Sequence, residues 1–132
     1  VSNKTHYNEM NVLSMHALIG AYQPQGYEWL DELNEVIGGN VDYFCNYVDE
    51  HFEGVNYSRP QGTYMVFLDC TEWCREHGRD IQWLLDEGAR VGVGYQDGRP
   101  FHGPCHIRVN LALPLSRVKE ACERLDRYVF NA

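Results

Sequence analysis

The sequence predicts an α+β domain in which a small, mostly antiparallel sheet packs against helices. Two observations indicate this class. Apolar residues recur at helical spacing in long stretches at both ends of the chain, and shorter segments with strand-like patterns lie between them. The connections are short, and no internal repeat or low-complexity linker interrupts them. We therefore expect a single domain over residues 1–132, with the element order ααββαββα.

The first part of the chain predicts two helices. Residues 9–22 place apolar side chains at helical spacing, and Pro24 ends the run. A second helix is expected over residues 25–52, because an apolar stripe continues there at steps of three and four opposite an acidic face. Gly38 and Gly39 lie in its middle and cost about 2 kcal/mol relative to two alanines. We expect one helix that is weakened or kinked at this pair and that buries its stripe in the core.

Four later segments predict strands. Residues 55–57 form a short edge strand, and residues 63–69 are apolar on both faces, which predicts a central strand covered on both sides. Residues 91–93 predict another brief strand. The clearest pattern is at residues 105–113, where β-branched residues fill the middle and a proline follows directly.

Two further helices are expected between and after these strands. Asp80 has the side chain of an N-cap, and the helix that it starts should end with Gly88 at the C′ position. Ser116 should cap a final helix that carries Val118 and Leu125 on one face.

The composition argues against several classes of protein. The chain has a net charge of −8 and no basic run longer than two residues, which argues against a nucleic-acid-binding surface. No apolar run approaches the length of a membrane span, and residues 1–11 lack the pattern of a signal peptide. The five cysteines, an odd number, favour reduced thiols and a cytoplasmic location. Because the chain opens on Val1 in what reads as mid-domain sequence, we expect a fragment of a longer protein.

The strand at residues 105–113 carries the candidate binding residue. Its apolar residues at 107, 109 and 111 alternate with polar ones, so Arg108 and Asn110 share the polar face. A guanidinium on a rigid strand can hold a carboxylate through two parallel hydrogen bonds. A half-exposed strand whose polar side faces water has the same spacing. The alternation alone therefore leaves the role of Arg108 open.

A second group of residues has the character of a metal site. Cys70, Cys74 and His77 have a spacing that zinc sites allow, and three further residues could complete a ligand set: His102, Cys105 and His106. Thiols in such positions more often pack in the core, so we predict no bound metal. A stand-alone ligand- or zinc-binding module stays as the alternative function. The sequence contains no glycine-rich phosphate loop, nucleophile elbow or paired-carboxylate motif.

Five ordered segments resemble the C-terminal part of class I/II (fold type I) pyridoxal-phosphate-dependent aminotransferases, in particular the cystathionine β-lyase-like branch. The segment around Arg108, followed by a proline and a last helix, is similar to the end of these enzymes. The other segments are similar to the A-Y…E-W-L-D-E-L signature, to the P-x-x-T-Y-L-x-W-x-D strand, and to the helix and loop that precede the arginine strand. They cover residues 21–33, 60–69, 84–88 and 91–98.

The resemblance implies the fold of the aminotransferase C-terminal small domain. It implies that Arg108 binds the α-carboxylate of an amino-acid substrate, with Asn110 as a supporting residue on the same face. It further implies a homodimeric parent enzyme with pyridoxal phosphate as its cofactor. The parent would carry out either transamination or C–S bond cleavage, and the resemblance leaves both open.

The resemblance also implies that this chain does not hold the cofactor by itself. The cofactor-binding lysine and the phosphate-binding residues of the family belong to a large domain that precedes the small one. Lys4-Thr5 echoes the lysine signature, but Lys4 lies only twelve residues before His16, which is too few for the family's spacing. We therefore reject Lys4 as the cofactor lysine and expect the chain alone to be inactive.

Overall fold

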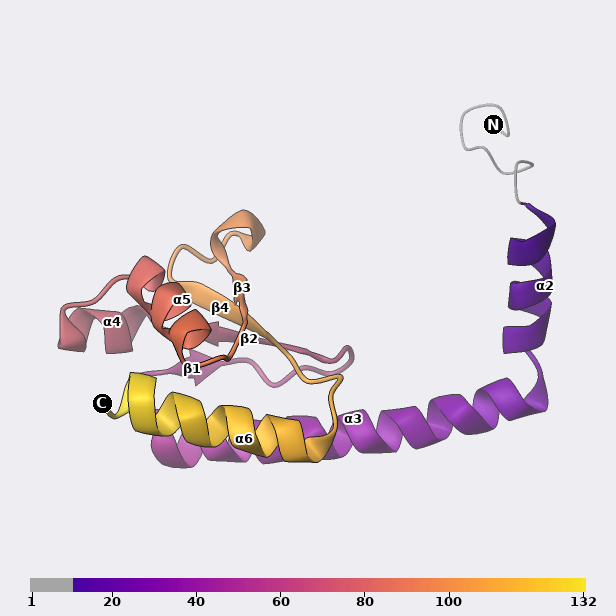
Figure 1. The fold of residues 1–132 in the computed structure, drawn as a ribbon, viewed down its shortest axis with the longest axis horizontal. Coiled ribbons are helices and arrows are strands. Elements are labelled where there is room, and N and C mark those ends of the chain that lie inside the picture. Colours follow the sequence, from indigo (N-terminus) through magenta and orange to yellow (C-terminus); the bar gives the residue numbers. More distant parts are fainter. Residues whose placement is uncertain (1–10) are drawn as a thin grey trace. The chain divides into compact units, whose positions relative to one another are not determined.

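The computed structural model describes residues 11–132, and Lys4 lies outside the described residues. The described chain begins with helices α2 (Val12–Ala21) and α3 (Pro24–His51) (Figure 1). Two compact units meet within α3, between Glu35 and Val36. As predicted, α3 is one helix that continues through the glycine pair at residues 38–39.

The unit from residue 36 onward contains a four-stranded antiparallel sheet. Its strands are β1 (Asn56–Tyr57), β2 (Met65–Asp69), β3 (Gln96–Asp97) and β4 (His106–Asn110), in the spatial order β1-β2-β4-β3. The central pair is β2 and β4, and its register places Phe67 opposite Arg108. This architecture confirms the predicted α+β class with a small antiparallel sheet.

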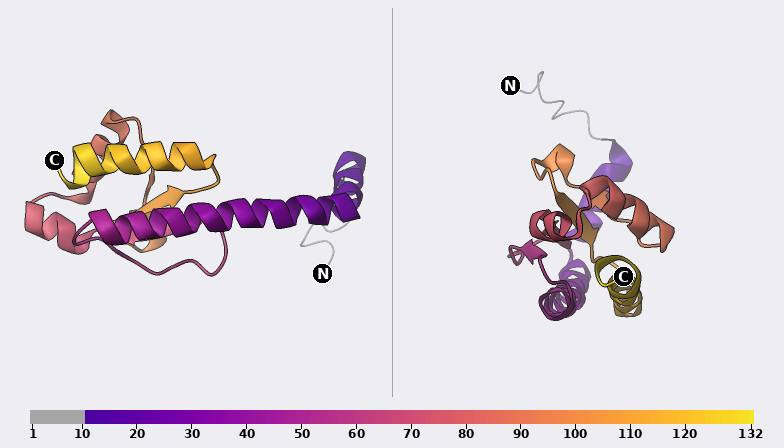
Figure 2. Two further views of the ribbon diagram at one scale, coloured as in Figure 1. Left: turned by 90° about the horizontal axis from the view of Figure 1, so that it is seen from below. Right: turned by 90° about the vertical axis from the view of Figure 1, so that its left-hand side faces the viewer.

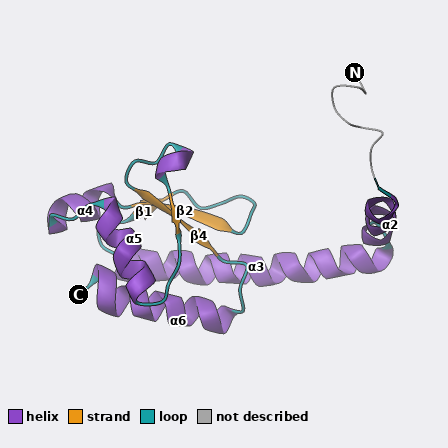
Figure 3. Ribbon diagram, turned by 45° about the horizontal axis from the view of Figure 1, so that its top comes forward, coloured by secondary structure: helices purple, strands orange, loops and turns teal. Residues whose placement is uncertain are grey.

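The remaining helices are α4 (Thr71–His77), α5 (Ile81–Arg90) and α6 (Leu115–Leu125), and a single π-helical turn, η2 (Asp126–Phe130), follows α6. The part of α3 within this unit lies beside α6 on one side of the sheet (Figure 2). A short 3-10 turn, η1 (Arg99–Phe101), lies on the other side (Figure 3). None of the helices formed by residues 11–132 is long and apolar enough to cross a membrane.

The core lies between the sheet and these helices, and one polar side chain is buried in it. The fully buried apolar side chains include Phe44, Val48, Val66, Leu68, Leu84, Ile107, Leu111, Val118 and Leu125. Asn40 of α3 is only 1% exposed, and its Nδ2 donates to the carbonyl oxygens of Leu111 at 2.9 Å and Leu113 at 2.7 Å. Because a buried amide is costly unless it is hydrogen-bonded, this pair of bonds fixes the chain that leaves β4 against α3.

The predicted burial is confirmed for one part of the helical stripe and wrong for another. Phe44 and Val48 of α3 are buried, as predicted, whereas Trp29 is 62% exposed. Helix α2 has no buried residue at all, and its Leu13 is 82% exposed. Helical spacing identifies an apolar face, but it does not reveal which partner covers that face.

The strand at residues 65–69 is central, as predicted, but it is not covered on both sides. Buried Val66 and Leu68 alternate with half-exposed Met65, Phe67 and Asp69. The expectation that both faces are covered was wrong because Phe67 and Met65 on the open face are apolar. In the sequence, half-exposed apolar residues cannot be told apart from buried ones.

Three predicted boundaries are also wrong. Asp80 is the N-cap of α5, as predicted, but the helix continues past Gly88. Gly88 is buried, and a Cβ at this position would collide with the ring of Tyr95. No strand forms at residues 91–93, and β3 begins later, at Gln96. Pro114 rather than Ser116 precedes the first residue of α6. Helix α4, which follows Cys70 and contains Cys74 and His77, was not predicted as a separate element.

Candidate functional site

The candidate site lies on the open face of the sheet. In an antiparallel pair, residues directly opposite each other point to the same face. The register pairs Arg108 with Phe67 of β2 and with Gln96 of β3, and it pairs Asn110 with Met65. The neighbours of Arg108 along β4 are buried in the core, so the strand alternation predicted from the sequence is confirmed.

The guanidinium of Arg108 stacks on an aromatic ring and has no counter-ion within the described part of the chain. Its guanidinium carbon Cζ lies 3.9 Å from the centroid of the Phe101 ring, which is on the 3-10 turn η1. Within residues 11–132, no carboxylate lies at ion-pair distance from Arg108 and no side-chain hydrogen bond involves it. The side chain is half-buried and faces an open cavity of about 410 Å³, which Tyr64, Tyr95, Gln96 and Asn110 also line.

The other arginines of the described chain differ from Arg108. Most of them pair with a carboxylate: Arg59 with Asp42, Arg75 with Glu72, Arg90 with Glu87, Arg99 with Asp97, and Arg117 and Arg124 with Glu120. Arg79 and Arg127 lie over aromatic rings as Arg108 does, but both are exposed. Arg108 is therefore the half-buried arginine in residues 11–132 that has no carboxylate partner. An unpaired, partly desolvated cation beside a cavity is poised to bind an anion.

Asn110 lies at the end of the strand and has one structural contact. Its Oδ1 accepts the backbone N–H of Ala112 at 2.8 Å, which closes a turn after β4. The side chain lines the same cavity as Arg108 and is exposed. The structure therefore brings the two predicted residues together at one cavity.

A second polar group lies farther along the same face. His106 and Asp69 are opposite each other, and both line a cavity of about 300 Å³. The Nδ1 atom of His106 is buried without a hydrogen-bond partner in the described chain and lies 3.8 Å from Asp69 Oδ1. Burial acts to raise the pKa of Asp69, but the two hydrogen bonds from Thr71 and the nearby His106 outweigh it, so the net pKa is lowered. Asp69 is therefore already satisfied by its neighbours.

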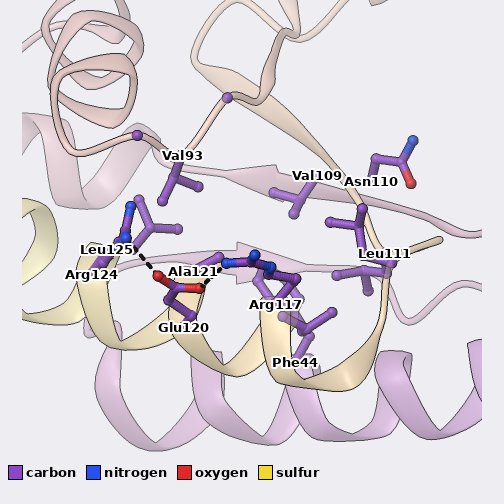
Figure 4. Close-up of a pocket in the computed structure, with 14 residues that line it drawn as sticks. Phe44, Val93, Val109, Asn110, Leu111, Arg117, Glu120, Ala121, Arg124 and Leu125 are labelled. Carbon is purple, nitrogen blue, oxygen red and sulfur yellow. Dashed lines mark hydrogen bonds and ion pairs between the residues drawn. The ribbon is translucent and has the colours of Figure 1, made fainter.

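A further cavity, of about 420 Å³, lies on the core side of β4 (Figure 4). Its walls are mainly apolar and come from β4, α3 and α6, with Phe44, Val109 and Leu111 among the lining residues. Two arginines reach this cavity, and both of them are paired with Glu120: Arg117 Nη1 lies 2.8 Å and Arg124 Nη2 2.5 Å from its carboxylate oxygens. Both guanidinium groups at this cavity therefore already have a carboxylate partner, whereas Arg108 has none among residues 11–132.

The predicted cysteine and histidine group does not assemble as a metal centre in the described chain. No three metal-ligating side chains among residues 11–132 come together in a suitable arrangement. The ring of His77 stacks on Trp73, and its Nδ1 contacts the Trp73 carbonyl oxygen at 2.9 Å. Burial raises the pKa of the Cys74 thiol to about 12, with a smaller contribution from Cys105. At neutral pH this thiol is protonated, whereas zinc binds the thiolate.

One lysine lies among the described residues. Lys119 is the lysine within residues 11–132, and it lies on the exposed side of α6 with its Nζ 5.2 Å from the centroid of the Tyr43 ring. It lines none of the three cavities described above.

Sequence reasoning missed the aromatic residues of the site. Phe101 was not singled out, although it lies in a Pro-Phe-His-Gly segment shortly before the arginine strand. Tyr64 and Tyr95 also line the cavity, one just before β2 and the other just before β3. An aromatic residue between a proline and a glycine, shortly before the strand that carries Arg108, is the sequence pattern that could have singled out Phe101, although not its contact with Arg108.

Comparison with known sequences identifies relatives of this chain. No family model matches it. The chain is 33% identical over 122 residues to the "Putative cystathionine beta-lyase" of Mycobacterium leprae, covering 80% of this chain and 29% of that protein. It is 31% identical over 112 residues to the protein MalY of Escherichia coli K12, covering 83% of this chain and 28% of MalY.

Solved structures give the same result. The pyridoxal-phosphate-bound "putative aminotransferase" from Clostridium difficile 630 superposes with a TM-score of 0.78 at 26% identity, over 89% of this chain and 30% of that one. The pyridoxal-phosphate-bound C–S lyase from Staphylococcus hominis has the same fold, with a TM-score of 0.81 at 22% identity, over 98% of this chain and 34% of that one.

The fold and these relatives confirm the class predicted from the sequence: the chain is a homologue of pyridoxal-phosphate-dependent aminotransferases and C–S lyases. Within this class, its sequence relatives are the cystathionine β-lyase and MalY proteins. The chain spans about 29% of the length of the curated relatives it matches, and it resembles their C-terminal part.

Proposed function

We propose that residues 1–132 form the C-terminal small domain of a pyridoxal-phosphate-dependent aminotransferase or C–S lyase that acts on an α-amino acid, and that Arg108 binds the substrate's α-carboxylate. One observation carries the role of Arg108: it is half-buried at a cavity and has no carboxylate partner among residues 11–132. A guanidinium offers two parallel N–H donors that match a carboxylate. Asn110 supplies a second polar contact from the rim of the same cavity.

Arg108 contributes to the reaction by orienting the substrate. A carboxylate held by two bonds to a guanidinium on a central strand has a fixed position, so the bonds at the substrate's Cα are fixed relative to the groups of the parent enzyme. Pyridoxal phosphate supplies the electron sink when it is bound, and the groups that hold it come from the rest of the parent. The isolated chain is then inactive.

The apolar surface of residues 12–36 supports a large partner domain. Helix α2 is apolar on all sides, yet none of its residues is buried. Val12, Leu13, Ile19 and Trp29 are each more than half exposed. A helix that is apolar all round is normally buried, and the relatives are more than three times as long as the segment that this chain matches. We propose that the large domain of the parent covers this surface and that the parent is a homodimer.

The five unpaired cysteines support a cytoplasmic parent.

The position of Lys119, the lysine among residues 11–132, supports the proposal that the chain does not bind the cofactor without the rest of the parent enzyme. Incubation of the purified chain with pyridoxal phosphate should leave no stable cofactor absorbance band after gel filtration. A band that persists in the wild-type chain and disappears in Lys4→Ala would contradict the rejection of Lys4.

The test of the Arg108 assignment is a comparison of two substrates in the full-length enzyme. In Arg108→Ala, turnover of the amino acid should fall sharply, whereas turnover of the matching amine without an α-carboxylate should barely change. Arg108→Lys should recover only part of the loss, because an ammonium cannot form the two parallel bonds. If the amine slows as much as the amino acid, Arg108 does not bind the carboxylate.

A further inference from the structure

We propose that Phe101 is a positioning residue for Arg108: its ring covers one face of the guanidinium and directs the substrate carboxylate to the in-plane N–H groups. The inference rests on the proposed carboxylate-binding function of Arg108. It is carried by the contact between the two side chains, in which Arg108 Cζ lies 3.9 Å from the Phe101 ring centroid, and by the turn that holds Phe101 in place.

Backbone hydrogen bonds hold this turn in place. The N–H of Phe101 donates to the Gly98 carbonyl oxygen at 2.8 Å, and the N–H of Gly103 donates to the same oxygen at 3.1 Å. The N–H of Gly98 donates to the carbonyl oxygen of His106 at 2.8 Å, which ties the turn to the start of the arginine strand. His102 ends the turn in the left-handed region, with φ 62°.

Side chains anchor the same turn from its other end. Arg99 Nε donates to both carboxylate oxygens of Asp97, at 3.0 and 2.8 Å, and Arg99 Nη2 donates to Gln82 of α5 at 2.9 Å. The backbone N–H of Arg99 also donates to Asp97, at 2.9 Å, and these bonds lower the pKa of the Asp97 carboxyl. The turn therefore stays hydrogen-bonded to both β3 and α5.

The turn also approaches the sheet too closely for larger residues. A Cβ at Gly103 would lie 2.5 Å from the ring carbon Cζ of Phe67 and 2.6 Å from the Cβ of His106, both of which are on the open face. Phe67 is in turn the cross-strand partner of Arg108. The position of Phe101 is thus set by contacts with the same two strands that carry the site.

Packing in the hydrophobic core does not account for an aromatic residue at position 101. Its side chain is 48% exposed, and it is absent from the apolar core. A guanidinium stacked on an aromatic ring loses water from the covered face and some of its rotational freedom, while its N–H edge stays open. The carboxylate then meets a guanidinium that is already oriented, which lowers the entropic cost of binding.

The experiment compares Phe101→Leu, Phe101→Tyr and Arg108→Ala in the full-length enzyme, with Tyr128→Leu as a matched control. Tyr128 is a similarly exposed aromatic residue with an arginine over its ring, but it lies far along the chain, in the turn after α6. Phe101→Leu should raise the KM for the amino acid about 5- to 20-fold and change kcat less than about twofold. Phe101→Tyr should restore the wild-type KM, and Tyr128→Leu should leave it unchanged.

A second measurement tests the stacking itself. In NMR spectra of the 132-residue chain, ring currents from Phe101 should displace the Arg108 Nε–H resonance upfield. This displacement should vanish in Phe101→Leu and persist in Phe101→Tyr. If the Leu variant does not fold, Phe101→Met removes the ring with a flexible side chain of similar size and takes its place.

The outcomes separate this inference from the proposed function. If Arg108→Ala affects the amino acid and not the carboxylate-free amine, but Phe101→Leu leaves KM unchanged, then Phe101 does not position Arg108 and the proposed function stands. If Phe101→Leu raises the KM of the amine as much as that of the amino acid, the positioning role is equally excluded. If Arg108→Ala itself does not distinguish the two substrates, the proposed function fails.

Discussion

The two arginine-lined cavities of this domain are similar in size and opposite in character. The cavity on the core side of β4, about 420 Å³, contains two arginines that share the carboxylate of Glu120. The cavity on the open face, about 410 Å³, contains Arg108, which has an aromatic ring beside it and no carboxylate among residues 11–132. Cavity volume therefore does not identify the binding site. A guanidinium that has no carboxylate partner among residues 11–132 does identify it, because a paired guanidinium would have to give up one carboxylate before it could bind another.

The largest expected effect is a contrast between substitutions at the two cavities: one should lower kcat/KM and the other should lower stability. Arg108→Ala should lower kcat/KM for the amino acid roughly 30- to several-thousand-fold in the full-length enzyme, because a charged bidentate contact is lost. Its effect on unfolding should be below about 1 kcal/mol, since Arg108 has one stacking contact and no ion pair to lose among residues 11–132. Arg124→Ala should have the opposite profile. It should cost about 1–2 kcal/mol of stability, because its bonds to Glu120 and to the Val91 carbonyl oxygen are lost, and leave kcat/KM nearly unchanged.

Urea unfolding of the purified chain and steady-state kinetics of the enzyme measure the two effects separately. Arg117→Ala serves as a second control, because Arg117 is exposed and has the same partner as Arg124. The comparison breaks down if Arg108→Ala unfolds the domain, since Arg108 would then be a structural residue.

The next effect concerns the tie between α3 and the end of β4. Asn40→Ala should destabilise the chain by about 2–4 kcal/mol, because two carbonyl oxygens would lose their donor in a buried position. Asn46→Ala, an exposed position on the same helix, should change stability by less than about 0.5 kcal/mol. Thermal or urea unfolding of the three proteins measures the difference. Equal stability of the two variants would show that the Asn40 bonds do not fix the strand end.

The sequence predicted the features that depend on local pattern. The alternation at residues 105–113 placed Arg108 and Asn110 on the open face, and the N-cap at Asp80 was identified from its side chain. Neither the helical pattern nor the alternation contains information about tertiary partners. The sequence therefore could not show that α2 is exposed in this chain, or that Gly88 lies inside a helix beneath Tyr95.

The candidate site was predictable in part, for the same physical reason. Arg108 was identified by its strand and by family resemblance. That it has no carboxylate partner among residues 11–132 depends on where the carboxylates lie in three dimensions, which the sequence does not show. Phe101 could not be connected with Arg108 from the sequence, because the turn that brings them together depends on hydrogen bonds between Gly98 and His106 and between Arg99 and Gln82. Cross-strand and turn contacts of this kind determine the site and are not encoded in a periodic pattern.

A smaller effect should appear in the pH dependence of stability. The hydrogen bond from Arg117 and the nearby charge of Arg124 lower the pKa of Glu120 below its usual value of 4.5. A lowered pKa means that the ion pairs stabilise the folded chain above about pH 4.5 and that this contribution is lost as the pH falls through the lower, folded-state value. Glu120→Gln should therefore destabilise the chain at neutral pH and flatten the acid limb of the stability curve. Glu123→Gln, a nearby exposed carboxylate, should not. Unfolding measured from pH 3 to pH 7 would contradict the prediction if both variants behaved alike.

The smallest effect is expected at the buried thiols, which differ from both cavities because they present neither charge nor open volume. Cys70 and Cys74 are buried, and burial raises the pKa of the Cys74 thiol to about 12. Zinc would have to displace a proton from each thiol in a desolvated environment, and His77 is already engaged with Trp73. We therefore expect elemental analysis to find no stoichiometric zinc, and thiol titration of the denatured chain to count five free groups. Cys74→Ser should leave the metal content unchanged. Stoichiometric zinc in the wild-type chain that is lost in Cys74→Ser would instead favour a stand-alone zinc-binding module, because a metal that depends on this thiol would require a ligand arrangement different from the one among residues 11–132.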